Sequence, residues 1–144
     1  MLNWFSQSPQ SDSVVITGAS TGIGAACALA LDKLGYRVFA GVRHSADGER
    51  LQQQAGPRLM PIRLDVTDAA SISAATHTVA AMVGERGLAG LVNNAGIGVA
   101  GPIELLPLAD WRRQFEVNVF GLIAVTQTFL PLIRTGRGRI INMG

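Results

Sequence analysis

A glycine-rich turn at residues 17–24 constrains this chain more than any other feature of its sequence. The turn reads Thr-Gly-Ala-Ser-Thr-Gly-Ile-Gly, follows the apolar run Val14–Ile16 and precedes a helical pattern over residues 25–34. Glycines at these spacings let the chain turn sharply off a strand and bring bare backbone close to a ligand. The N-terminus of the following helix attracts anions. The turn therefore predicts a cradle for the phosphates of a nucleotide, with a ligand-free glycine turn as the alternative.

The residues expected to contact these phosphates belong to the turn itself. The glycines leave the space, and two hydroxyl side chains add hydrogen-bond donors. The predicted contacts are Gly18, Ser20, Thr21, Gly22, Ile23 and Gly24.

Short β-branched runs alternate with helical patterns along the rest of the chain. Such alternation is typical of a parallel sheet with helices on both faces. We therefore predict an α/β fold, a doubly wound, Rossmann-like parallel sheet of about five strands, over residues 13–144. The expected strands include residues 14–16, 37–42, 59–64 and 88–92, and the expected helices include residues 69–83, capped by Asp68, and a long helix from Pro107 that bends or ends at Pro131.

The residue after the second strand decides which dinucleotide suits this fold. Ligands of doubly wound sheets bind at the carboxyl ends of the strands, where this position faces the ribose. Here Val42 is followed by Arg43, and no carboxylate occurs before Asp47. The planar fork of an arginine matches a 2′-phosphate. The sequence therefore predicts NADP as cofactor, with NAD less favoured, and a solvated Arg43 in a turn as the alternative.

Composition narrows the class of protein further. The net charge is +2, and the arginines are scattered, so a nucleic-acid partner is not indicated. A single cysteine, Cys27, provides neither a disulfide nor a cysteine metal cluster, and it fits a cytoplasmic location. Residues 1–12 are expected to form a flexible tail. The longest apolar stretch, residues 119–133, contains polar residues and Pro131 and falls short of the ~20 residues of a membrane span.

A second motif, Asn93-Asn94-Ala95-Gly96, follows the strand at residues 88–92. Together with the turn at residues 17–24, it resembles the short-chain dehydrogenase/reductase family. The resemblance implies that Asn93, Ala95 and Gly96 bind the cofactor, and that Asp65 and Val66 contact its adenine. A plain strand-to-helix turn is the alternative for Asp65 and Val66.

Asn118 is a polar residue in an apolar part of the predicted long helix. An amide buried there costs roughly 1–3 kcal/mol unless it is hydrogen-bonded, so we expect a partner or a role. The segment Asn118-Val119-Phe120-Gly121 resembles the family segment with the catalytic asparagine, which helps to hold a water in a proton relay. A core asparagine that specifies packing is the alternative.

The resemblance extends to residues 137–144, whose Ile140-Ile141 pair matches the fifth strand of the family. It implies that the catalytic Ser and Tyr-x-x-x-Lys would follow Gly144. Tyr36 and Lys33, the single Tyr and Lys of the chain, stand in reverse order at the opposite edge of the predicted sheet. We therefore expect a truncated domain that is inactive by itself.

The resemblance implies an NADP-preferring oxidoreductase that interconverts alcohols and ketones or aldehydes, of which this chain is the cofactor-binding half. Residues 96–111 are most similar to branches that act on retinol, steroids and other apolar substrates. We also expect a homo-oligomer through the helix around Val117 to Ile133. The alternatives are a non-catalytic nucleotide-binding or regulatory protein on the same fold, or a structural half-domain that binds no dinucleotide.

Overall fold

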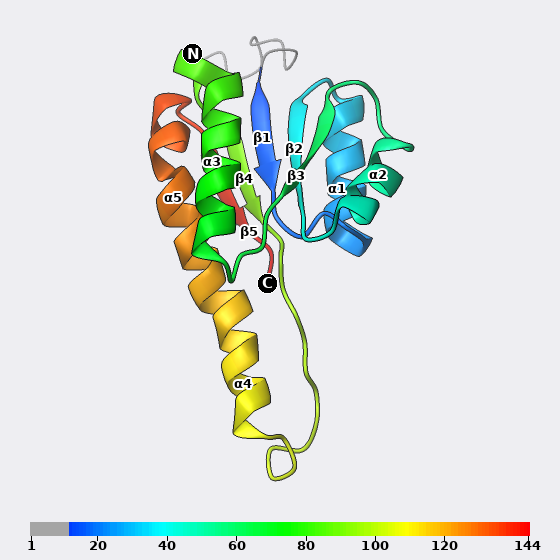
Figure 1. Ribbon diagram of the computed structural model, residues 1–144, viewed down its shortest axis with the longest axis vertical. Helices are drawn as coiled ribbons and strands as arrows, with labels where there is room; N and C mark the ends of the chain where they lie inside the picture. The colour runs from blue at the N-terminus through cyan, green and yellow to red at the C-terminus, as the bar shows by residue number, and fades with distance from the viewer. Residues whose placement is uncertain (1–11) are drawn as a thin grey trace, which may run out of the picture.

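The computed structural model of the chain describes residues 12–144, so the predicted tail lies outside the described residues except for Asp12. Five parallel strands form one sheet in the order β3-β2-β1-β4-β5. This arrangement confirms the predicted doubly wound sheet (Figure 1). The elements, in chain order, are β1 (Ser13–Ile16), α1 (Gly22–Lys33), β2 (Arg37–Val42), α2 (Ser45–Gln52), β3 (Leu59–Arg63), α3 (Ala69–Val83), the short 3₁₀ helix η2 (Gly84–Arg86), β4 (Gly90–Asn93), α4 (Leu108–Phe115), the π-helical turn η3 (Glu116–Gly121), α5 (Leu122–Thr135) and β5 (Arg139–Asn142).

Two hydrophobic clusters, one on each face of the sheet, hold the helices in place. Alternate strand residues point to opposite faces: Val15 packs with α3 and α5, whereas Val14 and Ile16 pack with α1 and α2. Figure 1 shows the two pairs of helices on opposite sides of the strands. Apolar runs in the central strands, rather than strict alternation with polar residues, follow from this burial on both faces.

The helix predicted at residues 69–83 is confirmed with its cap. The Asp68 carboxylate accepts hydrogen bonds from the backbone N–H groups of Ala70 and Ser71, at 2.9 and 3.2 Å. Caps of this kind contribute about 1 kcal/mol to a helix. The cap fixes where the chain leaves the carboxyl end of β3, and so it positions Asp65 and Val66 at that edge.

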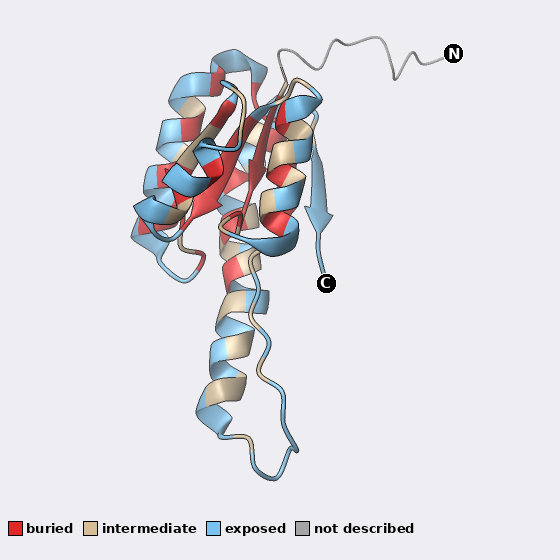
Figure 2. Cartoon of the chain, turned by 90° about the vertical axis from the view of Figure 1, so that its right-hand side faces the viewer, coloured by how far each residue is buried: buried red, intermediate tan, exposed pale blue. Residues whose placement is uncertain are grey.

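The segments α4, η3 and α5 form one continuous helix, Leu108–Thr135. Its second half covers the sheet through Val125, Phe129 and Ile133, whereas α4 extends beyond the carboxyl edge of the strands and contains no buried residue (Figures 1 and 2). The helix continues through Pro131 to Thr135, so the predicted end at Pro131 is wrong. By length and composition alone this helix could cross a membrane. This corrects the sequence analysis, which considered only the apolar stretch at residues 119–133 and found it too short. Within this helix, α5 buries one stripe of residues on the sheet and leaves the others exposed or half-buried.

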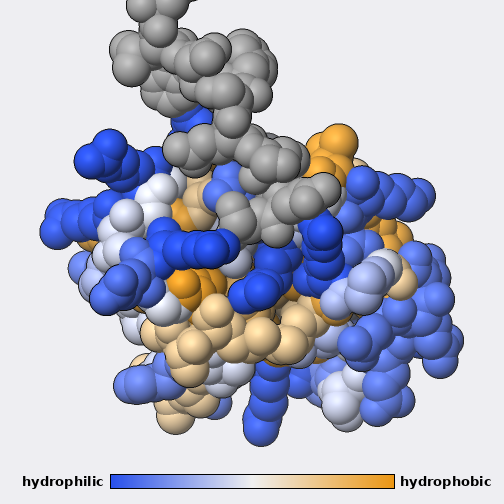
Figure 3. Space-filling model, turned by 90° about the horizontal axis from the view of Figure 1, so that it is seen from above, coloured by the Kyte–Doolittle hydropathy of each residue, from blue (hydrophilic) through white to orange (hydrophobic). Residues whose placement is uncertain are grey.

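The side of the sheet formed by β5 and the edge formed by the amino ends of the strands lie away from the glycine turn. β5, which begins at Arg139, is exposed along its whole length at one side of the sheet (Figure 2). The view onto the amino ends of the strands shows mainly hydrophilic residues around smaller apolar areas (Figure 3). Lys33 ends α1 and Tyr36 precedes β2, which places both at this amino edge, away from the glycine turn at the carboxyl edge.

Candidate nucleotide-binding site

The glycine turn joins β1 to α1 at the carboxyl edge of the sheet. Gly18 and Gly22 have φ values of 64° and 58°, which L-residues with side chains rarely adopt. Thr21 is the N-cap of α1, and its side chain makes no capping hydrogen bond. The first N–H groups of a helix have no partner within the helix, so those of α1 face the turn as donors for an anion.

The space beside the backbone differs among the three glycines of the turn. A Cβ atom on Gly18 would lie 2.7 Å from Cα of Ala95, and one on Gly24 would strike the Gly18 carbonyl and the Asn94 amide. These two glycines therefore allow close packing between the turn, the helix and β4. A Cβ on Gly22 would meet no atom within 4 Å. Gly22 thus borders open space in front of the helix N-terminus, where a phosphate can approach the backbone.

Hydrogen bonds lock the glycine turn to the end of β4. The Thr17 hydroxyl accepts from the N–H groups of Asn94 and Ala95, at 3.0 and 2.9 Å. The Asn94 amide donates to the carbonyl oxygens of Thr17 and Gly18, at 3.1 and 3.0 Å. Because β1 lies between β2 and β4, this is the point where strand order reverses, and where doubly wound folds bind their ligands.

Asn93, predicted to bind the cofactor, lies elsewhere. Its side chain is 3% exposed, and its amide donates to the Thr126 hydroxyl and to Oδ1 of Asn142. Its backbone carbonyl accepts from Met143. The side chain therefore ties β4 to β5 and α5, on the far side of the strand from the turn. This side chain thus joins neighbouring strand ends, and its contact with the cofactor is not supported.

The predicted adenine contacts do lie together. Asp65, Val66, Ala95 and Gly96 line one hollow of about 390 Å³, together with Arg43, Leu64, Thr67, Ile97, Arg113, Glu116 and Val117. We call this the inner hollow. Its walls come from the ends of β2, β3 and β4 and from the helix at Arg113–Val117, so distant segments of the chain form one slot beside the glycine turn.

Asp65 is one of two carboxylate residues that line the inner hollow, the other being Glu116. Its Oδ1 accepts from the backbone N–H of Thr67 at 2.9 Å and from the Thr67 hydroxyl at 2.7 Å. These two bonds, and to a smaller degree the charges of Arg43 and Arg63, hold the pKa of Asp65 below its ordinary value. The carboxylate therefore stays ionised at neutral pH and can accept a hydrogen bond from an exocyclic amine.

Asn118 is exposed, and not buried as the apolar pattern suggested. Its amide donates to the Ile97 carbonyl at 2.8 Å, and its oxygen accepts from the Ile97 N–H at 2.9 Å. One turn earlier, Gln114 donates to the Val99 carbonyl at 3.1 Å. The two side chains hold the loop after β4 against the helix. The expectation that Asn118 has a partner is confirmed, and its place in a proton relay stays a prediction.

The two sequence motifs contain Thr17 and Asn94, which position the turn. The sequence did not point to Gln114, which fixes the loop, or to Arg113, which lines the inner hollow. No local pattern marks Gln114, because its partner lies on a loop without periodicity, and none marks Arg113.

The fold and the site define a doubly wound, Rossmann-like α/β protein, with a glycine turn and an adjoining hollow at the carboxyl edge of its sheet. A family model described as short chain dehydrogenase matches residues 12–144. The chain therefore belongs to the short-chain dehydrogenase/reductase family.

Individual relatives agree with this assignment. Retinol dehydrogenase 5 of Mus musculus is 43% identical over 137 residues, which are 94% of this chain and 43% of that protein. 17-beta-hydroxysteroid dehydrogenase type 6 of Bos taurus is 42% identical over 149 residues, covering 99% of this chain and 47% of that protein. A short-chain dehydrogenase from Burkholderia cenocepacia, solved in complex with NADP, superposes with a TM-score of 0.80 at 30% identity, over 94% of this chain and 54% of that one. The chain thus spans less than half of the two curated relatives.

Proposed function

We propose that this chain is the cofactor-binding half of an NADP-preferring oxidoreductase that interconverts alcohols with ketones or aldehydes. The observation that supports the proposal best is the convergence, at one sheet edge, of the phosphate cradle, the inner hollow and Arg43. The cradle would hold the pyrophosphate through backbone N–H groups of α1. Asp65, Val66, Ala95 and Gly96 would hold the adenine, and the Arg43 guanidinium would bind the 2′-phosphate.

The bound cofactor would supply the hydride chemistry at its nicotinamide ring. The role of this chain is to bind and orient. Asn118 and Gln114 hold the loop after β4, and the turn at Gly96 leaves the backbone close to the site. Apolar alcohols and ketones are the proposed substrate class, since the relatives include a retinol dehydrogenase and a hydroxysteroid dehydrogenase.

Titration of the chain with NADPH and NADH, followed by nicotinamide fluorescence, tests the cofactor assignment. Tighter binding of NADPH is expected. Arg43→Ala should weaken NADPH binding by about tenfold, the size of one charge-assisted hydrogen bond near the surface, and should leave NADH binding nearly unchanged. Equal binding of both dinucleotides by the unaltered chain would contradict the preference.

A second candidate is a non-catalytic nucleotide-binding protein on the same fold. The observation in its favour is that Tyr36 and Lys33 lie at the amino edge, where neither reaches the cradle. An assay of NADPH consumption with a panel of apolar ketones, on this chain and on the product of the complete reading frame, separates the two. Binding with turnover by the complete product supports the oxidoreductase, whereas binding without any turnover by it supports the second candidate.

A cytoplasmic location belongs to the same proposal and is supported by the single thiol, Cys27. The location needs a direct test because the helix Leu108–Thr135 is long and apolar enough to cross a membrane. Cell fractionation should place the protein in the soluble fraction, and recovery in the membrane fraction would contradict the proposal.

A further inference from the structure

A second hollow lies beside the inner hollow, between α2 and β3. Its volume is about 660 Å³. We call it the outer hollow, and the residues that matter here are Arg43, His44, Ser45, Glu49 and Arg63. Arg43 lines both hollows. A ligand that fills the inner hollow could therefore extend one substituent past Arg43 into the outer one.

Arg63 reaches the outer hollow because of its position in β3. It pairs in register with Val42, the last residue of β2. Two residues earlier, Pro61 faces α2, since a Cβ on Gly48 would lie 2.7 Å from Cβ of Pro61. Residues two apart in a strand share a face, so Arg63 stands on the α2 side of the sheet. It lies at the same carboxyl edge as the glycine turn.

The charges around the outer hollow favour an anion. Arg43 and Arg63 both line this hollow, which places two positive charges at its wall. Within residues 12–144, the one ion pair closer than 4.0 Å is that of Asp47 with Arg50, so neither guanidinium has a carboxylate at that distance. Glu49 is the opposing charge in the hollow, and it lies one helical turn beyond Ser45.

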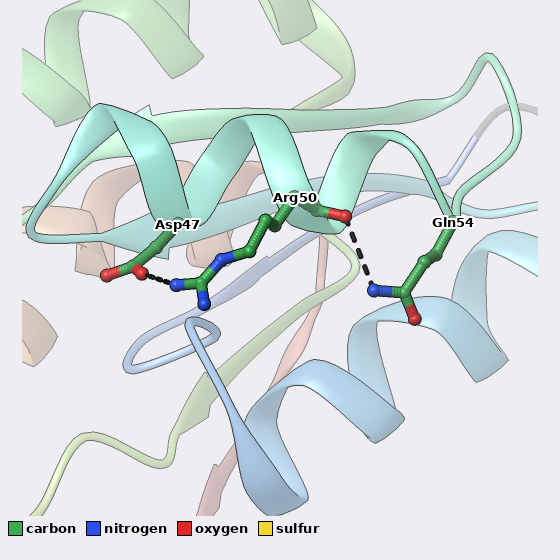
Figure 4. A network of polar contacts seen from close by, with 3 residues as sticks. All are labelled: Asp47, Arg50 and Gln54. Carbon is green, nitrogen blue, oxygen red and sulfur yellow. Dashed lines mark hydrogen bonds and ion pairs between the residues drawn. The ribbon is translucent and has the colours of Figure 1, made fainter.

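Arg50, which belongs to α2, is held apart from this site. Its guanidinium donates to Asp47 and its carbonyl accepts from Gln54 at 3.3 Å, so the three residues form a chain of contacts along the helix (Figure 4). Arg43 and Arg63 thus have guanidinium donors available for a ligand, whereas Arg50 donates to Asp47.

We infer that Arg63 is a second residue that determines cofactor specificity, and that Arg43 and Arg63 together bind the 2′-phosphate of the dinucleotide at the mouth of the outer hollow. A phosphate monoester accepts several hydrogen bonds from arginine forks. The N–H groups at the start of α2, where His44 makes no side-chain cap, add to the same field. This inference rests on the proposed preference for NADP and extends it to a residue of β3.

The test measures dissociation constants of NADPH and NADH for the chain and for Arg63→Ala, Arg63→Lys, Arg43→Ala and Arg50→Ala. Arg63→Ala should weaken NADPH binding by about tenfold and change NADH binding by less than twofold. Arg63→Lys keeps the charge but not the planar fork, so its affinity for NADPH should lie between those of the unaltered chain and of Arg63→Ala. Arg50→Ala is the matched control, since it removes an equal charge close by but outside the hollow, and it should change both constants little.

Each outcome separates the two proposals. If the unaltered chain binds NADPH no better than NADH, the proposed cofactor preference fails and the inference fails with it. If the chain prefers NADPH and Arg43→Ala loses that preference, but Arg63→Ala behaves like Arg50→Ala, only the inference is overturned. An equal loss of NADH binding in Arg63→Ala would show a role in folding and would also overturn it. Arg63→Gln, which retains a polar side chain with three carbons but removes the charge and the guanidinium fork, replaces Arg63→Ala if circular dichroism shows that the alanine variant is unfolded.

Discussion

At the scale of single residues, Gly22 combines two properties that only glycine provides. Its φ is 58°, and the space beside it is open. Gly22→Val should abolish dinucleotide binding, because the branched side chain would occupy the space assigned to the pyrophosphate. The left-handed backbone adds a cost of roughly 1–2 kcal/mol in stability. Titration with NADPH and a thermal melt measure the two effects.

Gly84 offers a matched control for this variant. Its φ is 55° and it too has open space around it, but it lies between α3 and β4, at the amino edge. Gly84→Val should lower stability at least as much, because its ψ of −137° adds to the strain of the positive φ, and it should leave NADPH binding intact. If both variants lost binding equally, strain and not occlusion would explain the loss, and the turn would no longer be identified as the cradle.

Asp65 should make stability depend on pH in the acid range. Its pKa in the folded chain is lowered, chiefly by hydrogen bonds from Thr67, whereas an unfolded Asp titrates near ~3.9. The stabilisation is therefore complete above the unfolded pKa and is lost as the pH falls through the lower folded value. Urea unfolding between pH 7 and pH 2.5 should show a steeper acid decline for the unaltered chain than for Asp65→Asn. Thr67→Val, which removes one of the two donors, should be intermediate, and identical slopes would contradict the assignment.

At the scale of elements, the local signals were sufficient for the sheet and for most of its helices. Asp68 marked the start of α3 because a carboxylate there satisfies backbone N–H groups within the same turn. The π-helical turn at Glu116–Gly121 left no such signal. Asn118 was expected to be buried because its neighbours are apolar, yet it is exposed and bonded to Ile97. Its surroundings depend on a loop whose course no periodicity specifies.

The contact of Asn118 with the loop can be measured directly. Asn118→Ala should raise the hydrogen-exchange rate of the Ile97 amide by about fivefold, because a hydrogen bond of this kind contributes about 1 kcal/mol. Asn118→Asp keeps an acceptor for that N–H and should retain most of the protection. Gln114→Ala removes a bond to a carbonyl only, so it serves as the control with an unchanged Ile97 rate. Equal exchange in all four proteins would show that the contact does not form in solution.

At the scale of the whole molecule, the sequence predicted the location of the site but not its shape. Strand order and the two motifs were enough to bring residues 17–24 to the end of β4. The inner and outer hollows form from β3, α2 and the helix at Arg113–Val117, which are far apart in the chain. Asn93 shows the same limit, since its motif suggested a ligand contact whereas its side chain serves the packing of β4 on β5.

Exposed apolar residues cluster along the helix Leu108–Thr135 and on β5. Phe115, Phe120 and Ile123 of the helix are 52%, 57% and 45% exposed, and Ile141 of β5 is 53% exposed. Contiguous apolar patches of more than a few hundred Å² are rare on soluble monomers. We therefore expect the 144-residue chain to self-associate or to need a partner surface, as the sequence prediction of an oligomer through Val117–Ile133 also implies.

Sedimentation velocity over a range of concentrations tests this expectation with a matched pair of variants. Phe120→Gln removes a large apolar side chain from the exposed face of the long helix and should shift the chain toward monomer. Leu34→Gln removes one that is 64% exposed at the end of α1 and should leave the distribution unchanged. Both sites are exposed, so neither change should lower the melting temperature by more than a few degrees. A monomer at all concentrations in the unaltered chain would contradict the expectation, and equal shifts in both variants would place the contact outside the helix.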